Sequence, residues 1–215
     1  MMDVRMLTVG PVQENCFIVR RQGADSALII DPGDEADRLL AAVSELGIET
    51  VEAILLTHTH FDHIGAVAPV ARATRAPVYC PALETQVLAN IMDYVPWPGF
   101  GPFESYEADH TVAGGETLEL AGLTVEVLFT PGHSPGHVTY AITDEDALFS
   151  GDVLFQGSVG RVDLPGGDWP TLLGSIESLL ERFPEEATVY PGHMGITTLG
   201  RERASNPFLR ELAER

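Results

Sequence analysis

The sequence contains no lysine, so all 12 of its basic residues are arginine. Against them stand 32 aspartates and glutamates, which gives a formal net charge of -20 at pH 7. A field of this sign repels phosphate backbones, and the chain has no extended basic arm that would offset it. We therefore expect no nucleic-acid partner.

Cysteine and long apolar runs are also scarce. Cys16 and Cys80 are too few for a disulfide framework and do not form a Cys-x-x-Cys pair, so we expect two buried small hydrophobic side chains. No stretch approaches the ~20 apolar residues of a membrane span. The N-terminus lacks the basic region and apolar core of a secretory signal. These absences predict a cytoplasmic protein that does not enter a membrane.

The chain has 215 residues, of which 45% are hydrophobic, enough for one well-buried core and too few for a second full domain. We expect a single domain over residues 1–215. Short β-rich runs predict three adjoining antiparallel strands at 4–9, 15–20 and 27–30. Asp34 is expected to cap a helix over 36–46 that Gly47 ends. A strand at 53–56, a helix at 64–74 and a strand at 78–80 follow.

Residues 90–115 are rich in proline and glycine without a clear period, which predicts a long irregular excursion that either covers a substrate or is a simple insertion. Beyond it the pattern predicts strands at 116–120, 124–129, 138–142 and 147–149, a helix at 169–182, a strand at 188–190 and a last helix from Pro207. Each half supplies strands and then helices. The expected fold is therefore of the α/β (α+β) class, a four-layer αββα sandwich.

Histidine is concentrated in one short segment, Thr57-His58-Thr59-His60-Phe61-Asp62-His63, directly after the strand at 53–56. In an extended loop, residues i and i+2 point to the same side, so His58 and His60 can converge on one ion. Asp62 and His63, where the chain turns into the next helix, can face a second ion. The segment predicts a metal site at the end of this strand.

Three further strand ends carry potential metal ligands. His133 and His193 each end a Pro-Gly-His turn, and Asp152 ends Ser150-Gly151-Asp152. An aspartate in such a place is by itself more typical of a turn or a helix cap. Because it accompanies five histidines and Asp62, we interpret it as a ligand.

This order of motifs, His-x-His-x-Asp-His, Pro-Gly-His, Gly-Asp and Pro-Gly-His, resembles the metallo-β-lactamase superfamily across nearly the whole chain. The resemblance implies that one metal is held by His58, His60 and His133, and a second by Asp62, His63 and His193, with Asp152 bridging both. Class B1 β-lactamases carry cysteine at the position of Asp152, and flavodiiron proteins carry an acidic residue at that of His60. The resemblance therefore favours the glyoxalase II-like branch and disfavours antibiotic hydrolysis.

Two other segments resemble short, single-domain glyoxalase II-like (hydroxyacylglutathione hydrolase-like) enzymes: Gly160-Arg161-Val162-Asp163, and residues 197–203 leading to 206–208. The implied activity is hydrolysis of S-2-hydroxyacyl-thiol esters, such as S-lactoylglutathione, by a hydroxide that bridges two divalent metals. Zinc is favoured, and iron or manganese would suit the same ligands. Asp62 is expected both to bind metal and to orient the hydroxide.

Arg161 is the candidate for contacting an anionic small-molecule thioester, unless it pairs with Asp163 and only shapes the loop. His110 and His137 fit no ligand position, and His137 is expected to be a hydrogen-bonding neighbour of the ligands. Other functions stay open: a mononuclear iron persulfide dioxygenase, since a Gly-Arg-x-Asp loop also occurs there, a lactonase or other ester hydrolase or phosphodiesterase, and a purely structural metal site. The oligomeric state is left open by the sequence.

Overall fold

The computed structural model describes residues 1–210, and two six-stranded mixed sheets dominate it. The first sheet has the order β1 (Met2–Val9), β2 (Glu14–Arg21), β3 (Ser26–Ile30), β4 (Thr50–Leu55), β5 (Val78–Pro81) and β6 (His110–Val112). Strands β1 to β3 are antiparallel, as predicted, and β3 to β6 are parallel.

The second sheet has the order β14 (Thr197–Thr198), β13 (Thr188–Pro191), β10 (Ala147–Gly151), β9 (Val138–Ile142), β8 (Leu123–Phe129) and β7 (Thr117–Leu120). β10 and β13 are parallel, while β9 is antiparallel to both β8 and β10. The carboxyl ends of β8, β10 and β13 therefore meet at one edge of this sheet. A small hairpin, β11 (Leu154–Phe155) and β12 (Ser158–Val159), follows β10.

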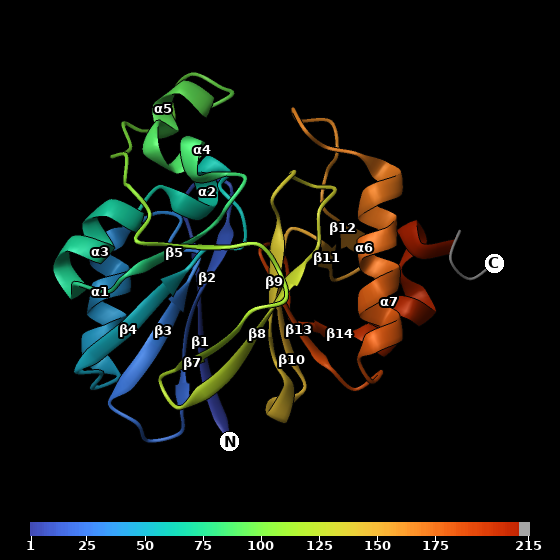
Figure 1. Cartoon of the computed structure of the whole chain (residues 1–215), viewed down its shortest axis with the longest axis horizontal. Helices are drawn as coiled ribbons and strands as arrows, with labels where there is room; N and C mark the ends of the chain where they lie inside the picture. Colours follow the sequence, from blue (N-terminus) through green and yellow to red (C-terminus); the bar gives the residue numbers. More distant parts are fainter. Residues whose placement is uncertain (211–215) are drawn as a thin grey trace.

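The two sheets lie face to face with helices on both outer sides (Figure 1). α1 (Ala36–Glu45) and α3 (Val67–Thr74) cover the first sheet, and α6 (Trp169–Arg182) and α7 (Leu199–Ser205) cover the second. α2 (Phe61–Ile64), α4 (Thr85–Ala89) and α5 (Ile91–Tyr94) lie toward one end of the sandwich. Single turns of 3-10 helix occur at Thr143–Glu145 and Pro207–Leu209.

Successive side chains of a strand point to opposite faces, and this alternation builds three apolar layers. On β2, Ile18 packs toward α1 and α3, while its neighbour Phe17 packs between the sheets against Phe149. A third cluster lies between the second sheet and α6, around Leu172 and Ile176. Three apolar layers between four layers of backbone confirm the αββα sandwich.

The helix expected over 64–74 begins only at Val67, as α3, because α2 ends at Ile64 and the chain bends at Gly65 and Ala66 between them. A Cβ on Gly65 would lie 2.4 Å from the carbonyl oxygen of Gly33, so this residue lets the bend pack against the turn after β3. The expected cap by Asp34 is also wrong. The N-cap is Glu35, in the left-handed region at φ 52°, and within residues 1–210 Asp34 accepts a hydrogen bond only from the Glu35 backbone nitrogen, at 2.6 Å.

The excursion over 90–115 is not wholly irregular, since it contains α5 and the edge strand β6. The expected last helix from Pro207 is a 3-10 turn as far as Leu209, and the remainder of that prediction extends to residues outside the described range. The preceding helix, α7, was not predicted. Cys16 and Cys80 are buried and free, as expected. Within residues 1–210, no helix is both long and apolar enough to span a bilayer.

Candidate metal centre

The seven predicted ligands all follow strand ends at one edge of the sandwich. His58, His60, Asp62 and His63 come after β4 and run into α2, while His133 follows β8. Asp152 and His193 follow the neighbouring parallel strands β10 and β13. The fold thus brings together side chains that are up to 135 positions apart in the sequence.

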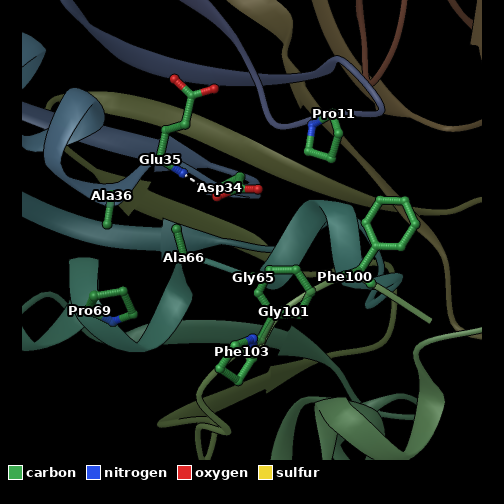
Figure 2. Close-up of a pocket in the computed structure, with 12 residues that line it drawn as sticks. Pro11, Asp34, Glu35, Ala36, Gly65, Ala66, Pro69, Phe100, Gly101 and Phe103 are labelled. Atoms are coloured by element: carbon green, nitrogen blue, oxygen red, sulfur yellow. Dashed lines mark hydrogen bonds between the residues drawn. The ribbon is translucent and has the colours of Figure 1, made fainter. Parts of the chain in front are cut away.

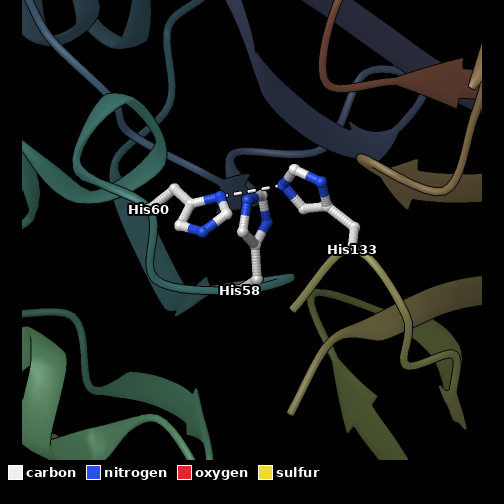
Figure 3. Close-up of side chains that lie close together, drawn as sticks. All are labelled: His58, His60 and His133. Carbon is white, nitrogen blue, oxygen red and sulfur yellow. Dashed lines mark hydrogen bonds between the residues drawn. The ribbon is translucent and has the colours of Figure 1, made fainter. Parts of the chain in front are cut away.

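The donor atoms lie at the spacing expected of ligands that share an ion. Metal bonds of ~2.0–2.2 Å at tetrahedral angles separate two ligand atoms by roughly 3.3 Å. Asp62 Oδ2 lies 3.3 Å from His193 Nε2, and His60 Nδ1 lies closer than this to His133 Nε2, at 2.8 Å. Figure 3 shows the rings of His60 and His133 turned toward each other beside His58. The groups His58, His60, His133 and Asp62, His63, His193 each have ligand atoms within 4.8 Å of one another.

Asp152 lies between these two groups. Its carboxylate oxygens are 3.3 Å from His63 Nε2, 3.4 Å from His133 Nε2 and 3.5 Å from His193 Nε2. It therefore contacts histidines of both groups, as a bridging carboxylate would. Its backbone nitrogen donates a hydrogen bond to His137 Nε2 at 3.0 Å, which holds the residue in place.

Three buried polar atoms at the centre have no hydrogen-bond partner among the described residues: His58 Nε2, His63 Nε2 and Asp152 Oδ1. Leaving such atoms unpaired is costly in a protein interior. Divalent cations bound by these atoms would satisfy them. The donor set of imidazole nitrogens and carboxylate oxygens suits zinc, iron or manganese.

Asp31, which the sequence did not single out, fixes the protonation of two ligands. It accepts hydrogen bonds from Thr57 Oγ1 at 2.6 Å and from His63 Nδ1 at 2.9 Å. Because the Thr57 hydroxyl gives its one proton to Asp31, its oxygen must accept from His58 Nδ1, 3.1 Å away. Both imidazoles therefore carry a proton on Nδ1 and turn Nε2 to the centre. Burial opposes the charged form of His63, but Asp152 and Asp31 raise its pKa well above the usual value, so a metal bound at its Nε2 would replace a proton. Although Asp31, His58 and His63 also cluster closely, this pairing gives Asp31 the role of orienting the ligands.

Backbone carbonyls orient two more histidines in the same way. His133 Nδ1 donates to the carbonyl of Arg161 at 2.7 Å, and His193 Nδ1 donates to that of Gln13 at 3.2 Å. His137 is buried beside the ligands and hydrogen-bonds Thr130 and Asp152, as expected. His110 lies on β6 against Tyr79, away from the centre.

Burial sets the charge of these groups. Burial lowers the pKa of His58 well below its usual value, and burial together with the neighbouring His133 lowers the pKa of His60 to about 4. Both are therefore neutral at pH 7, the form that binds metal. Burial opposes the charged form of Asp152, but the surrounding histidines His63, His193 and His133 hold its pKa well below the usual value. The carboxylate is ionised and ready to bind a cation.

The glycines of the two Pro-Gly-His turns are required by close packing. A Cβ on Gly192 would lie 2.3 Å from Asp152 Oδ1 and 2.6 Å from His63 Cε1. A Cβ on Gly132, at φ 128°, would lie 2.2 Å from the backbone nitrogen of Leu172. Any side chain at these positions would displace the ligand turns.

Glu84 is a second buried carboxylate that the sequence did not reveal. It accepts hydrogen bonds from Thr59, through the backbone nitrogen at 2.7 Å and the hydroxyl at 2.9 Å. It also accepts from the Ser134 hydroxyl at 2.5 Å and the Gly136 nitrogen at 2.8 Å. Glu84 thus ties the loop of His58 and His60 to the loop of His133. Glu14, also buried and not predicted, lies 3.7 Å from His63 Nδ1.

A cavity of about 560 Å³ opens beside the ligands and is lined by His60, Asp62, His133, Asp152 and His193. This volume lies in the range of small-molecule sites. Arg161 also lines it, with its guanidinium paired to Asp163 at 2.6 and 2.7 Å and stacked over Trp97 at 5.6 Å. Arg161 thus lies where it could contact a substrate, and it also forms the pair with Asp163 that would shape the loop.

A separate hollow of about 380 Å³ lies between the start of α1 and the excursion, where Phe100 and Phe103 form part of its wall (Figure 2). Asp34 and Glu35 border it, but Glu35 already accepts from the Gly10 nitrogen and from Arg38. None of the seven predicted ligands lines this hollow. It therefore does not belong to the metal centre.

Comparison with known proteins agrees with this geometry. A family model described as the metallo-beta-lactamase superfamily matches residues 9–193. A Bacillus subtilis protein named "Probable metallo-hydrolase YqgX" is 42% identical over 213 residues, which cover 97% of this chain and 98% of the relative. The Haemophilus influenzae "Hydroxyacylglutathione hydrolase GloC" is 34% identical over 210 residues, with 97% and 98% covered.

Solved structures are similar over nearly the whole chain. The BLEG-1 B3 metallo-beta-lactamase is 40% identical with a TM-score of 0.90, covering 97% of this chain and 99% of its own. TTHA1623, solved in a di-iron-bound form, is 42% identical with a TM-score of 0.84, covering 96% and 100%. The similarity therefore includes both the fold and the segments that carry the ligands.

Proposed function

This chain belongs to the metallo-beta-lactamase superfamily and is a metallo-hydrolase, and from that premise we propose that it hydrolyses S-2-hydroxyacyl thioesters, such as S-lactoylglutathione or the thioester of another cellular thiol. The observation that carries the proposal is the set of seven donors with buried, unpaired His58 Nε2, His63 Nε2 and Asp152 Oδ1 beside a cavity of about 560 Å³. The relative named hydroxyacylglutathione hydrolase supports this substrate class.

We assign one divalent metal to His58, His60 and His133, a second to Asp62, His63 and His193, and Asp152 to both. Zinc is the proposed metal, with iron or manganese as alternatives. The di-iron-bound form of TTHA1623 supports iron as an alternative. Two cations held there would lower the pKa of water and polarise the carbonyl of a bound substrate.

In the proposed reaction, water adds to the thioester carbonyl carbon and the carbon–sulfur bond breaks. The products are a carboxylic acid and a thiol, the thiolate taking up a proton as it leaves. Asp62 lines the cavity and also lies at the metal centre, so we assign it to accept a hydrogen bond from the attacking water and orient it toward the substrate. The backbone that carries the neighbouring ligands is held by Asp31 through the Thr57 nitrogen and by Glu84 through the Thr59 nitrogen.

The test is metal content together with thiol release from thioesters of several thiols. The proposal predicts about two metals per chain and rapid thiol release that Asp152→Ala abolishes while the fold persists. Asp37→Ala, on the exposed side of α1, serves as the matched control and should retain turnover.

One iron per chain with oxygen uptake and sulfite formation on glutathione persulfide would instead establish a dioxygenase. Unfolding of Asp152→Ala, with no turnover by the wild type, would indicate a structural metal site.

A second candidate is hydrolysis of β-lactams, which the similarity to the BLEG-1 B3 metallo-beta-lactamase favours. The same donors would serve, because a lactam carbonyl is also attacked by water. A chromogenic cephalosporin offered beside the thioesters discriminates the two. Turnover of the cephalosporin above that of every thioester would make β-lactam hydrolysis the main activity.

A further inference from the structure

The walls of the cavity beside the metal centre indicate what kind of thiol arm the substrate has. The lactoyl group has few atoms and its carbonyl must reach the ligands, so most of a cavity of about 560 Å³ receives the thiol arm. Away from the ligands the walls are mainly apolar. They include Leu83, Val87, Tyr94, Trp97, Leu164 and Met194.

Arg161 is the one arginine among the described residues that line this cavity, and the whole chain has no lysine. Its Nε and Nη2 atoms both donate to the Asp163 carboxylate, at 2.6 and 2.7 Å, so one of the edges at which a guanidinium can hold a substrate carboxylate with two hydrogen bonds is occupied. Its guanidinium carbon lies over the Trp97 ring, 5.6 Å from the ring centre. The positive charge at the cavity is therefore matched by a negative one.

We propose that this pocket selects thioesters whose thiol arm has no net negative charge, and that Asp163 sets this selectivity by occupying Arg161. The inference rests on the proposed thioesterase function and deepens it. A glutathione arm, with two carboxylates and one ammonium, would meet apolar walls, a neutralised arginine and a chain of formal charge -20. An uncharged arm of the same shape would lose no hydration of ions on entry.

The contact between Arg161 and Trp97 joins the two halves of the fold. Trp97 belongs to the excursion after α5, whereas Arg161 and Asp163 belong to the loop after β12. Trp97 is 40% exposed and lines the cavity, so its fluorescence reports on occupancy there. The other tryptophan, Trp169, begins α6 and does not line the cavity.

The test compares S-lactoylglutathione with the same compound made uncharged by acetylating its amine and methylating both carboxylates. Thiol release gives kcat/KM for each, and Trp97 fluorescence gives the affinity for the two unreactive S-(2-hydroxypropyl) thioethers. For the wild type we expect kcat/KM about tenfold higher for the uncharged thioester, and a matching order of affinities. Trp97→Phe should remove the fluorescence response, and Trp169→Phe should keep it.

Asp163→Asn removes the carboxylate that pairs with Arg161 and frees the guanidinium to bind a charged substrate. Because 49% and 66% of the two side chains are accessible to solvent, the increase in kcat/KM for the charged thioester should be modest. We expect the ratio of the two kcat/KM values to move about threefold toward the charged thioester. Asp37→Asn removes the same charge far from the cavity, and its ratio should stay at the wild-type value.

Preference of the wild type for the charged thioester, or equal ratios for Asp163→Asn and Asp37→Asn, would overturn the selectivity while leaving thioester hydrolysis intact. Absence of thiol release from both compounds, whether zinc, iron or manganese is loaded, would overturn the proposed function and this inference with it.

Discussion

Replacing Asp31 with asparagine should reverse the protonation of two metal ligands. In the native chain Asp31 accepts from His63 Nδ1 and from the Thr57 hydroxyl, which in turn accepts from His58 Nδ1. In the native chain the Thr57 backbone nitrogen donates to Asp31 Oδ1 at 2.8 Å. The amide oxygen of the asparagine would keep this hydrogen bond, so the NH₂ group of the asparagine would face His63 and the Thr57 hydroxyl. Each histidine would then accept at Nδ1 and carry its proton on Nε2, the atom that must bind metal.

Loss of such an orienting partner weakens metal binding by about 10- to 100-fold, equivalent to roughly 1.4 to 2.7 kcal/mol per site. Because His58 and His63 belong to different proposed ions, both affinities should fall. Competition with a chromophoric chelator measures the affinities, and nitrogen-15 NMR of the imidazoles reports which nitrogen is protonated. Thr57→Val should affect His58 alone, and Asp34→Asn, three positions along the same turn, should change neither. Wild-type affinity for both ions in Asp31→Asn, with the proton still on Nδ1 of His63, would show that Asp31 does not set the protonation of these ligands.

The other predictions concern the loops that carry the ligands and the contribution of metal to stability. Glu84→Gln leaves at least one buried backbone donor of Thr59 or Gly136 unpaired, a cost of about 2 kcal/mol, and should lower Tm by roughly 6 °C in a thermal melt; an unchanged Tm would contradict it. Gly192→Ala places a methyl group 2.3 Å from Asp152 Oδ1 and should reduce metal content, whereas Gly174→Ala, which meets no neighbour, should not. Chelation should lower Tm, since metal at 100 times its Kd contributes about 2.7 kcal/mol per site, and readdition should restore it; equal melting curves would argue against a bound ion.

The metal-ligand segments could be predicted because their signals are local. His58 to His63 and the two Pro-Gly-His turns each place ligand types at short spacing after a strand. The residues that orient these ligands could not be predicted, because their partners are distant in the chain. Asp31 looks like part of a turn, yet it acts on Thr57 and His63, 26 and 32 positions away. Glu84 likewise acts on loops 25 to 52 positions away.

The same distinction applies to secondary structure. Long elements with clear periodicity, such as α6, matched their predicted bounds, since burial of one face determines them. Short elements varied: β9 matched its predicted bounds of 138–142, whereas several other short elements were not predicted. α5 and β6 lie in a segment dominated by proline and glycine, and β6 forms only because it pairs with β5. α7 contains Gly200, which lies against Glu185, so tertiary packing outweighs the low helical propensity of glycine there.

The proposed two-metal site is tested most simply by the number of metal ions that the purified chain binds, measured by elemental mass spectrometry for the wild type and Asp152→Ala. The seven-donor geometry predicts about two ions per wild-type chain and a lower number when the shared carboxylate is removed. A wild-type chain that binds no ion when offered zinc, iron or manganese would contradict it.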